Sequence, residues 1–166
     1  MNTEFNNELI NHEMGKDLSR RRLMNHMNEY TTNKSLFLVL HLNHYLQKEK
    51  NEPHKIKKSL KKFFKSIDNE VFSKKSNKQL RRYVMIENLK KRGKTHVQSA
   101  IEIPTHLNSV ALKKIIKRNL NDQIVRLEHI TSVYDHKGLI DYNTKDINAF
   151  ETNVFAFDEV NSYKFG

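Results

Sequence analysis

The spacing of apolar residues changes along the chain, and these changes predict the first elements. SLFLVLHL, residues 35–42, is a continuous apolar run with the length of a buried strand. After Pro53, which suits the first turn of a helix, apolar residues recur at steps of three and four up to Val71. Lysines occupy many of the positions between them, so we expect an amphipathic helix with a basic outer face.

The later part of the chain alternates between strand-like and helix-like patterns. The expected elements are strands over 82–89 and 95–103 joined by the turn 90–93, a helix over 109–120, a strand over 124–130, a helix over 138–147 and a strand over 153–160. This order predicts an α+β fold with a five-stranded, largely antiparallel sheet flanked by helices. Residues 1–34 are polar and are expected to form a partly helical extension before one domain over 35–166.

Net charge adds the first indication of a partner. The 166 residues include 30 Lys and Arg against 19 Asp and Glu, which gives a formal net charge of +11. Such an excess indicates a polyanionic partner, most often nucleic acid, although a solvated basic surface is the plainer alternative. The absence of cysteine excludes thiolate metal sites and suits a cytoplasmic protein. No apolar run approaches the roughly 20 residues of a membrane span, so we expect no membrane partner.

A candidate metal site follows from the hairpin over 82–103. Side chains alternate along a strand, so His96 and Gln98 share one face. If 90–93 is the turn, Glu87 lies directly opposite His96 on that face. A carboxylate, an imidazole and an amide suit a hard or borderline ion such as Mg²⁺ or Mn²⁺. A simple charge pair between Glu87 and His96 is the equally weighted alternative.

Two Tyr-x-x-Lys segments supply candidate nucleophiles, because a tyrosine can attack a phosphodiester and keep the phosphate as an ester. They begin at Tyr134 and Tyr142. Tyr142 and Lys145 are three apart on a predicted helix and share a side of it, which favours Tyr142 and leaves Tyr134 as the alternative nucleophile. Either tyrosine could instead be an amphipathic packing residue.

The order of these residues resembles the HUH endonucleases, and within them the Rep catalytic domains of rolling-circle plasmids and circular single-stranded DNA viruses. LHLN at 40–43 resembles the first motif, which helps to bind origin DNA, although its usual aromatic-Thr beginning is missing. HVQ at 96–98 resembles the metal-binding second motif, with Gln98 in place of the second histidine. YNTK at 142–145 resembles the third, nucleophilic motif. In viral members a glutamate on the preceding strand completes the metal site, as Glu87 would here.

The resemblance implies a metal-dependent, site-specific nickase that initiates rolling-circle replication of a plasmid or phage. Tyr142 would form a 5′-phosphotyrosyl link, and Lys145 would assist it. The DNA-binding residues are expected to be Asn43 of the first motif and three basic residues in or next to the turn, Lys91, Arg92 and Lys94. The partner would be single-stranded origin or hairpin DNA. No G-x-x-x-x-G-K-[ST] loop is present, so unwinding would need a separate helicase.

Three other functions stay open from the sequence. An HUH transposase or a mobilisation relaxase would share the chemistry and differ in the DNA that it acts on. A non-catalytic nucleic-acid-binding module would share only the basic charge.

Overall fold

The computed structural model describes residues 31–49, 53–87 and 95–144, and six residues between 21 and 29. The elements in chain order are β1 (Ser35–Leu42), α2 (His44–Lys48), α3 (Pro53–Phe72), β2 (Arg82–Glu87), β3 (His96–Glu102), α4 (Ser109–Arg118), β4 (Val125–Ser132) and α5 (His136–Thr144). Every strand and helix predicted within these ranges is present. The short helix α2 was not predicted, and the strand predicted over 153–160 lies outside the described residues.

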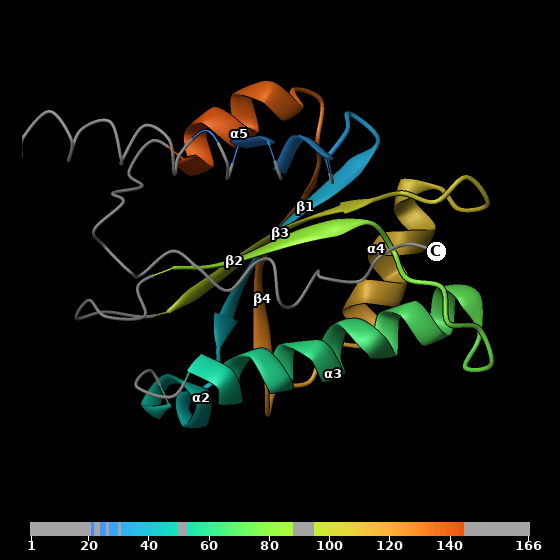
Figure 1. The fold of residues 1–166 in the computed structure, drawn as a ribbon. Coiled ribbons are helices and arrows are strands. Elements are labelled where there is room, and N and C mark those ends of the chain that lie inside the picture. Colours follow the sequence, from blue (N-terminus) through green and yellow to red (C-terminus); the bar gives the residue numbers. More distant parts are fainter. Residues whose placement is uncertain are drawn as a thin grey trace, which may run out of the picture.

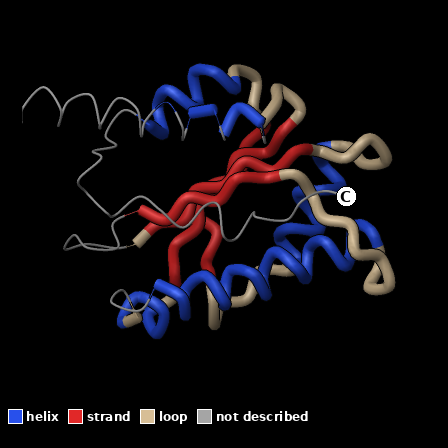
Figure 2. Tube along the Cα trace, in the orientation of Figure 1, coloured by secondary structure: helices blue, strands red, loops and turns tan. Residues whose placement is uncertain are grey.

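The four strands form one antiparallel sheet in the order β2-β3-β1-β4. Helices α3 and α4 cover one face, and α5 lies over the other, so the strands form a layer between helices (Figures 1 and 2). The α+β class with an antiparallel sheet is therefore confirmed. The described part of the chain contains four of the five predicted strands.

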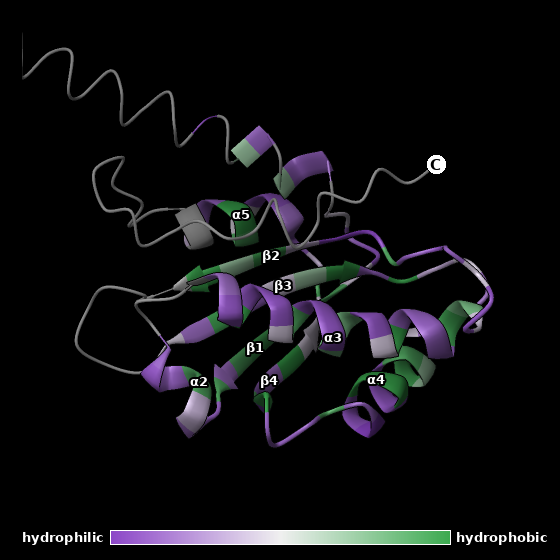
Figure 3. Cartoon of the chain, turned by 60° about the horizontal axis from the view of Figure 1, so that its bottom comes forward, coloured by the Kyte–Doolittle hydropathy of each residue, from purple (hydrophilic) through white to green (hydrophobic). Residues whose placement is uncertain are grey.

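The larger apolar core lies between the sheet and the two helices α3 and α4. Every second residue of β1 from Leu36 to Leu42 is buried there, as the alternation of side chains in a strand requires. The apolar stripes of both helices meet these residues: Ile56, Leu60, Phe63, Phe64 and Ile67 on α3, and Leu112, Ile115 and Ile116 on α4. The outward side of α3 is hydrophilic (Figure 3), as its lysine-rich spacing predicts.

A buried ion pair fastens α3 to β2 inside this core. The terminal guanidinium nitrogens of Arg82, Nη1 and Nη2, donate to the two carboxylate oxygens of Asp68 at 2.8 and 3.0 Å. Asp68 also accepts from the backbone N–H of Leu80 at 3.0 Å, and the Arg82 guanidinium lies 4.9 Å from the centre of the Phe64 ring. Both charges are removed from water and each neutralises the other. Loss of either residue would leave an unpaired charge in the core.

A second, smaller core lies on the opposite face of the sheet, beneath α5. Tyr83, Met85 and Ala100 of the sheet are buried there with Ile140 of α5 and Met27 of the N-terminal segment. Met27 shows that at least this part of the predicted extension packs against the domain. His41, His96 and Gln98 occupy alternating strand positions on this same face.

Helix α5 begins at His136, two residues earlier than the sequence pattern predicts. The reason is a capping interaction, because the Asp135 carboxylate accepts from the backbone N–H of Gly138 at 3.0 Å. A β-carbon at position 138 would collide with the Asp135 carboxylate, so glycine leaves room for this cap. Gly138 thus lies inside the first turn of the helix and not before it.

Within the described ranges, no helix is both long and apolar enough to cross a bilayer.

Candidate metal centre

Two histidines face each other on neighbouring strands in the middle of the sheet. His41 of β1 and His96 of β3 are directly paired in the antiparallel register. Their rings lie on the α5 face with centroids 4.3 Å apart and planes tilted by 54°. Strand pairing alone therefore places two imidazoles side by side.

A carboxylate joins the two histidines because β4 is irregular at this level. The pairing of β1 with β4 shifts between Val39, which faces His129, and Leu40, which faces Leu127. Glu128 is the extra residue of a β-bulge, a feature that commonly redirects a side chain beside a functional site. Its Oε2 lies 2.6 Å from Nε2 of His41 and 3.4 Å from Nδ1 of His96.

The three ligand atoms are close enough to hold one ion. All lie within 4.8 Å of one another. Two ligands at right angles around an ion, each about 2.1 Å away, are about 3.0 Å apart. The His96–Glu128 distance already suits this geometry, and the His41–Glu128 distance would have to open by a few tenths of an ångström. The arrangement could therefore hold a metal ion after a small movement of the Glu128 side chain.

The cluster is open to solvent on one side. The side chains of His41 and His96 are 26% and 28% exposed, and that of Glu128 is 46% exposed. An ion held there would keep coordination positions for water or a substrate oxygen. The second nitrogen of His41, Nδ1, is buried and has no hydrogen-bond partner among the described residues. His41 makes a polar contact with Glu128 and a ring contact with His96, the other two members of the cluster.

The predicted ligand set overlaps with this cluster at one residue, His96. The register confirms that Glu87 lies directly opposite His96, as counting back from the turn predicts. The Glu87 side chain lies outside the described residues, so its part in the site stays a prediction. Gln98 follows His96 on the same face, opposite Val39, at about 6.6 Å along the strand. Gln98 also stays a predicted ligand.

The two candidate nucleophiles differ in their setting. Tyr142 lies on α5, as predicted, and is 61% exposed. Ile140 marks the buried side of that helix, and Tyr142 lies about 200° further round its axis at 100° per residue. Tyr134 precedes α5 and is 89% exposed. Lys145 lies outside the described residues. Tyr142 is therefore on the solvent side of α5, directed away from the sheet face that carries the cluster.

Asn43 has a framework role in the structure. Its side chain is buried, caps α2 by accepting from Leu46 N–H at 2.9 Å, and donates to the carbonyls of Asp122, at 3.1 Å, and Gln123. The two contacts with carbonyls hold the end of β1 against the turn before β4. The predicted contact of Asn43 with DNA is untested. The predicted DNA-binding residues Lys91, Arg92 and Lys94 lie outside the described residues.

His41 and Glu128 are the site residues that the sequence reasoning missed. Identifying His41 requires the pairing of β1 with β3, two segments more than 50 residues apart in the chain. The position of Glu128 could have been inferred from the spacing of its neighbours. Leu127 and Ile130 both pack against the larger core although they are three residues apart. Strict alternation in a strand would send them to opposite faces, so this spacing indicates a bulge.

Comparisons with known proteins add no assignment. No protein-family model, no curated protein and no solved structure matches the chain.

Proposed function

We propose that this protein is a metal-dependent enzyme that nicks single-stranded DNA through a tyrosine nucleophile. The observation that carries the proposal is the convergence of His41, His96 and Glu128 on the sheet face that α5 covers. Helix α5 bears Tyr142 in the third of three motifs that resemble those of Rep endonucleases. Because Tyr142 is on the solvent side of this helix, α5 would have to turn for the tyrosine oxygen to reach a phosphate at the cluster. The net charge of +11 supports a polyanionic substrate.

The reaction would proceed by transesterification at one phosphate. When bound, a divalent ion would withdraw charge from a phosphate oxygen and stabilise the crowded transition state. The Tyr142 oxygen would bond to phosphorus while the bond to the 3′-oxygen breaks. The phenol proton would leave to solvent, and the 3′-oxygen would gain a proton. The products would be a 5′-phosphotyrosyl link and a free 3′-hydroxyl, which could prime replication.

The observed cluster favours Mn²⁺ over Mg²⁺. Two imidazole nitrogens and one carboxylate form a softer ligand set than the all-oxygen environments that Mg²⁺ prefers. Imidazole nitrogens suit transition metals, and Mn²⁺ is the transition metal that shares the carboxylate ligands and octahedral geometry of Mg²⁺. We therefore propose Mn²⁺ as the better activating ion of the two.

A search for a covalent protein–DNA adduct tests this function. The chain would be incubated with Mn²⁺ and a pool of single-stranded oligonucleotides, including hairpins, that carry a label on the 3′ side. The expected product is a labelled species that survives denaturing gels and maps to Tyr142. Tyr142→Phe keeps the ring and its packing and should form no adduct, and Tyr134→Phe is the matched control that should retain it.

The outcomes separate the alternatives. An adduct on Tyr134 would keep the enzyme class and overturn the choice of nucleophile. DNA binding without an adduct on any tyrosine, with Mn²⁺ bound and the chain folded, would refute the nickase and favour a non-catalytic binding module. Plasmid or phage replication, transposition and mobilisation share this chemistry, so the sequence of the trapped DNA would decide between them.

A further inference from the structure

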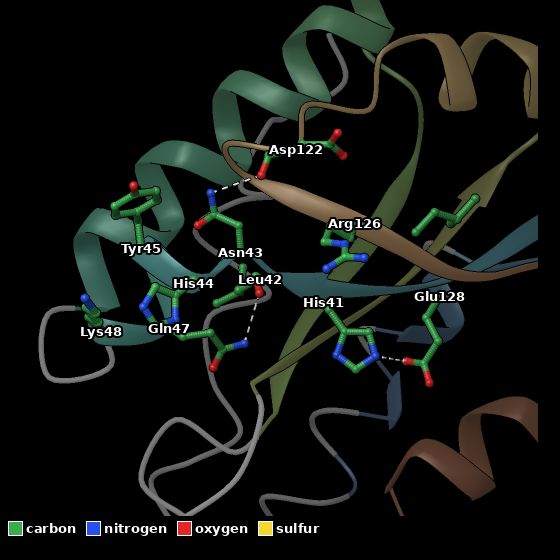
Figure 4. A pocket seen from close by; sticks show the side chains of 11 residues that line it. His41, Leu42, Asn43, His44, Tyr45, Gln47, Lys48, Asp122, Arg126 and Glu128 are labelled. Carbon is green, nitrogen blue, oxygen red and sulfur yellow. Dashed lines mark hydrogen bonds and ion pairs between the residues drawn. The ribbon is translucent and has the colours of Figure 1, made fainter.

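A cavity of about 1150 Å³ extends from the metal centre to the short helix α2. Figure 4 shows Tyr45 and Lys48 on α2 at one end and His41 with Glu128 at the other. Arg126, which pairs with His41 in the register, lies beside His41 on β4. The cavity is partly open to solvent, so an extended chain could enter it.

Two side chains hold α2 in place beside the cavity. Asn43 caps the helix and bridges to the turn before β4. Gln47 donates to the carbonyls of Leu42 and Thr95, both at 3.1 Å, and accepts from the Thr95 N–H at 2.9 Å. Leu46 is buried between these anchors. The remaining residues of α2 are therefore displayed from a firmly attached support.

The side of α2 that faces solvent displays an aromatic ring and a positive charge. Tyr45 is 74% exposed, and its ring meets His44 edge-on with centroids 6.1 Å apart. Lys48 and Arg126 are both exposed along the same cavity. The lining contains two acidic residues. Glu128 contacts His41 and His96, and Asp122 lies in the turn whose backbone accepts a hydrogen bond from Asn43.

We propose that Tyr45 is a stacking platform for a base of single-stranded DNA that lies along this cavity. Proteins that bind single strands combine exposed aromatic rings, on which bases stack, with cationic side chains that contact phosphates. Tyr45 supplies the ring, and Lys48 and Arg126 supply the charges. This inference rests on the proposed function for the kind of substrate, and it names the contact that would position the strand beside His41 and Glu128.

A tryptophan at position 45 makes the contact directly measurable. The natural chain contains no tryptophan, so Tyr45→Trp would be the sole indole reporter. The variant would be titrated with a 12-nucleotide oligo(dT) and with an abasic strand of the same length and charge, in EDTA. We expect saturable quenching by oligo(dT) and little by the abasic strand. Equal quenching by both strands, or quenching by neither, would overturn the proposal.

Binding measurements on three variants give an independent test. Tyr45→Ala should weaken oligo(dT) binding by roughly 5- to 150-fold, the usual loss for one stacked base. Tyr45→Phe keeps the ring and should remain within about twofold of the parent. Val110→Ala, at a 59% exposed apolar position on α4, is the control and should bind like the parent. Equal affinity of Tyr45→Ala and Tyr45→Phe would refute stacking.

The two proposals can fail separately. Quenching at position 45 without any tyrosine adduct would refute the nickase and leave the stacking site. An adduct on Tyr142 that forms equally well in Tyr45→Ala, with unchanged affinity, would refute the stacking site and leave the nickase.

Discussion

The buried pair of Asp68 and Arg82 allows a stability prediction whose magnitude follows from the structure. Asp68 accepts three hydrogen bonds at 2.8–3.0 Å, two from Arg82 and one from Leu80. The two side chains are only 4% and 3% exposed. Asp68→Asn keeps the shape of the side chain but removes the negative charge, so the Arg82 charge would remain buried without its counter-ion.

The expected loss is large for a single polar substitution. Removing one partner of a buried ion pair typically costs about 3–5 kcal/mol in the free energy of unfolding. For a chain of this size, each kcal/mol lowers the melting temperature by about 2–4 °C, so a fall of roughly 6–20 °C is expected. Glu70 and Arg118 form the matched surface pair, with Arg118 64% exposed. Glu70→Gln should cost no more than about 1 kcal/mol.

Urea denaturation of the parent and the variants measures these losses. The double variant Asp68→Leu/Arg82→Met removes both charges together and should be far more stable than Asp68→Asn, because no charge is left buried alone. A loss below about 1 kcal/mol in Asp68→Asn would refute the reasoning. So would a double variant that is no more stable than the single one.

Three further predictions concern DNA binding and the framework of the site. Affinity for single-stranded DNA should fall linearly with salt on logarithmic axes, and Arg126→Gln should reduce the slope by about 0.7 if that residue contacts one phosphate. Tyr142→Phe should bind DNA as tightly as the parent in a filter assay, since its hydroxyl is needed only for chemistry. Asn43→Ala should lower stability by about 1–2 kcal/mol in urea denaturation, through loss of the α2 cap.

Much of the fold was predictable because the elements carry strong local periodicities. The apolar run of β1 and the three- and four-residue steps of α3 predicted the ends of both elements to within one residue of the observed ends. The hairpin register was also predictable, since the turn over 90–93 places Glu87 opposite His96 by counting. Helix α2 was missed because its five residues are too few to show a period.

The metal centre was only partly predictable, because its residues meet through long-range pairing. His96 was found from its place in the hairpin. His41 joins it only through the pairing of β1 with β3, and Glu128 only through the bulge in β4. Local patterns report neither the order of strands in a sheet nor a shift in their register. The uneven spacing of Leu127 and Ile130 was the one local signal of that bulge.

Mn²⁺ binding measured by electron paramagnetic resonance tests the central claim, that His41, His96 and Glu128 form a metal centre. We expect one bound ion per chain and electron–nuclear coupling to imidazole nitrogen. His41→Ala should weaken binding at least tenfold, because loss of a ligand should cost no less than the 10- to 100-fold lost with an outer-shell partner. His106→Ala, which alters a histidine that contacts Val71 away from the cluster, should bind like the parent. Binding of Mn²⁺ by His41→Ala as tight as that of the parent would contradict the account.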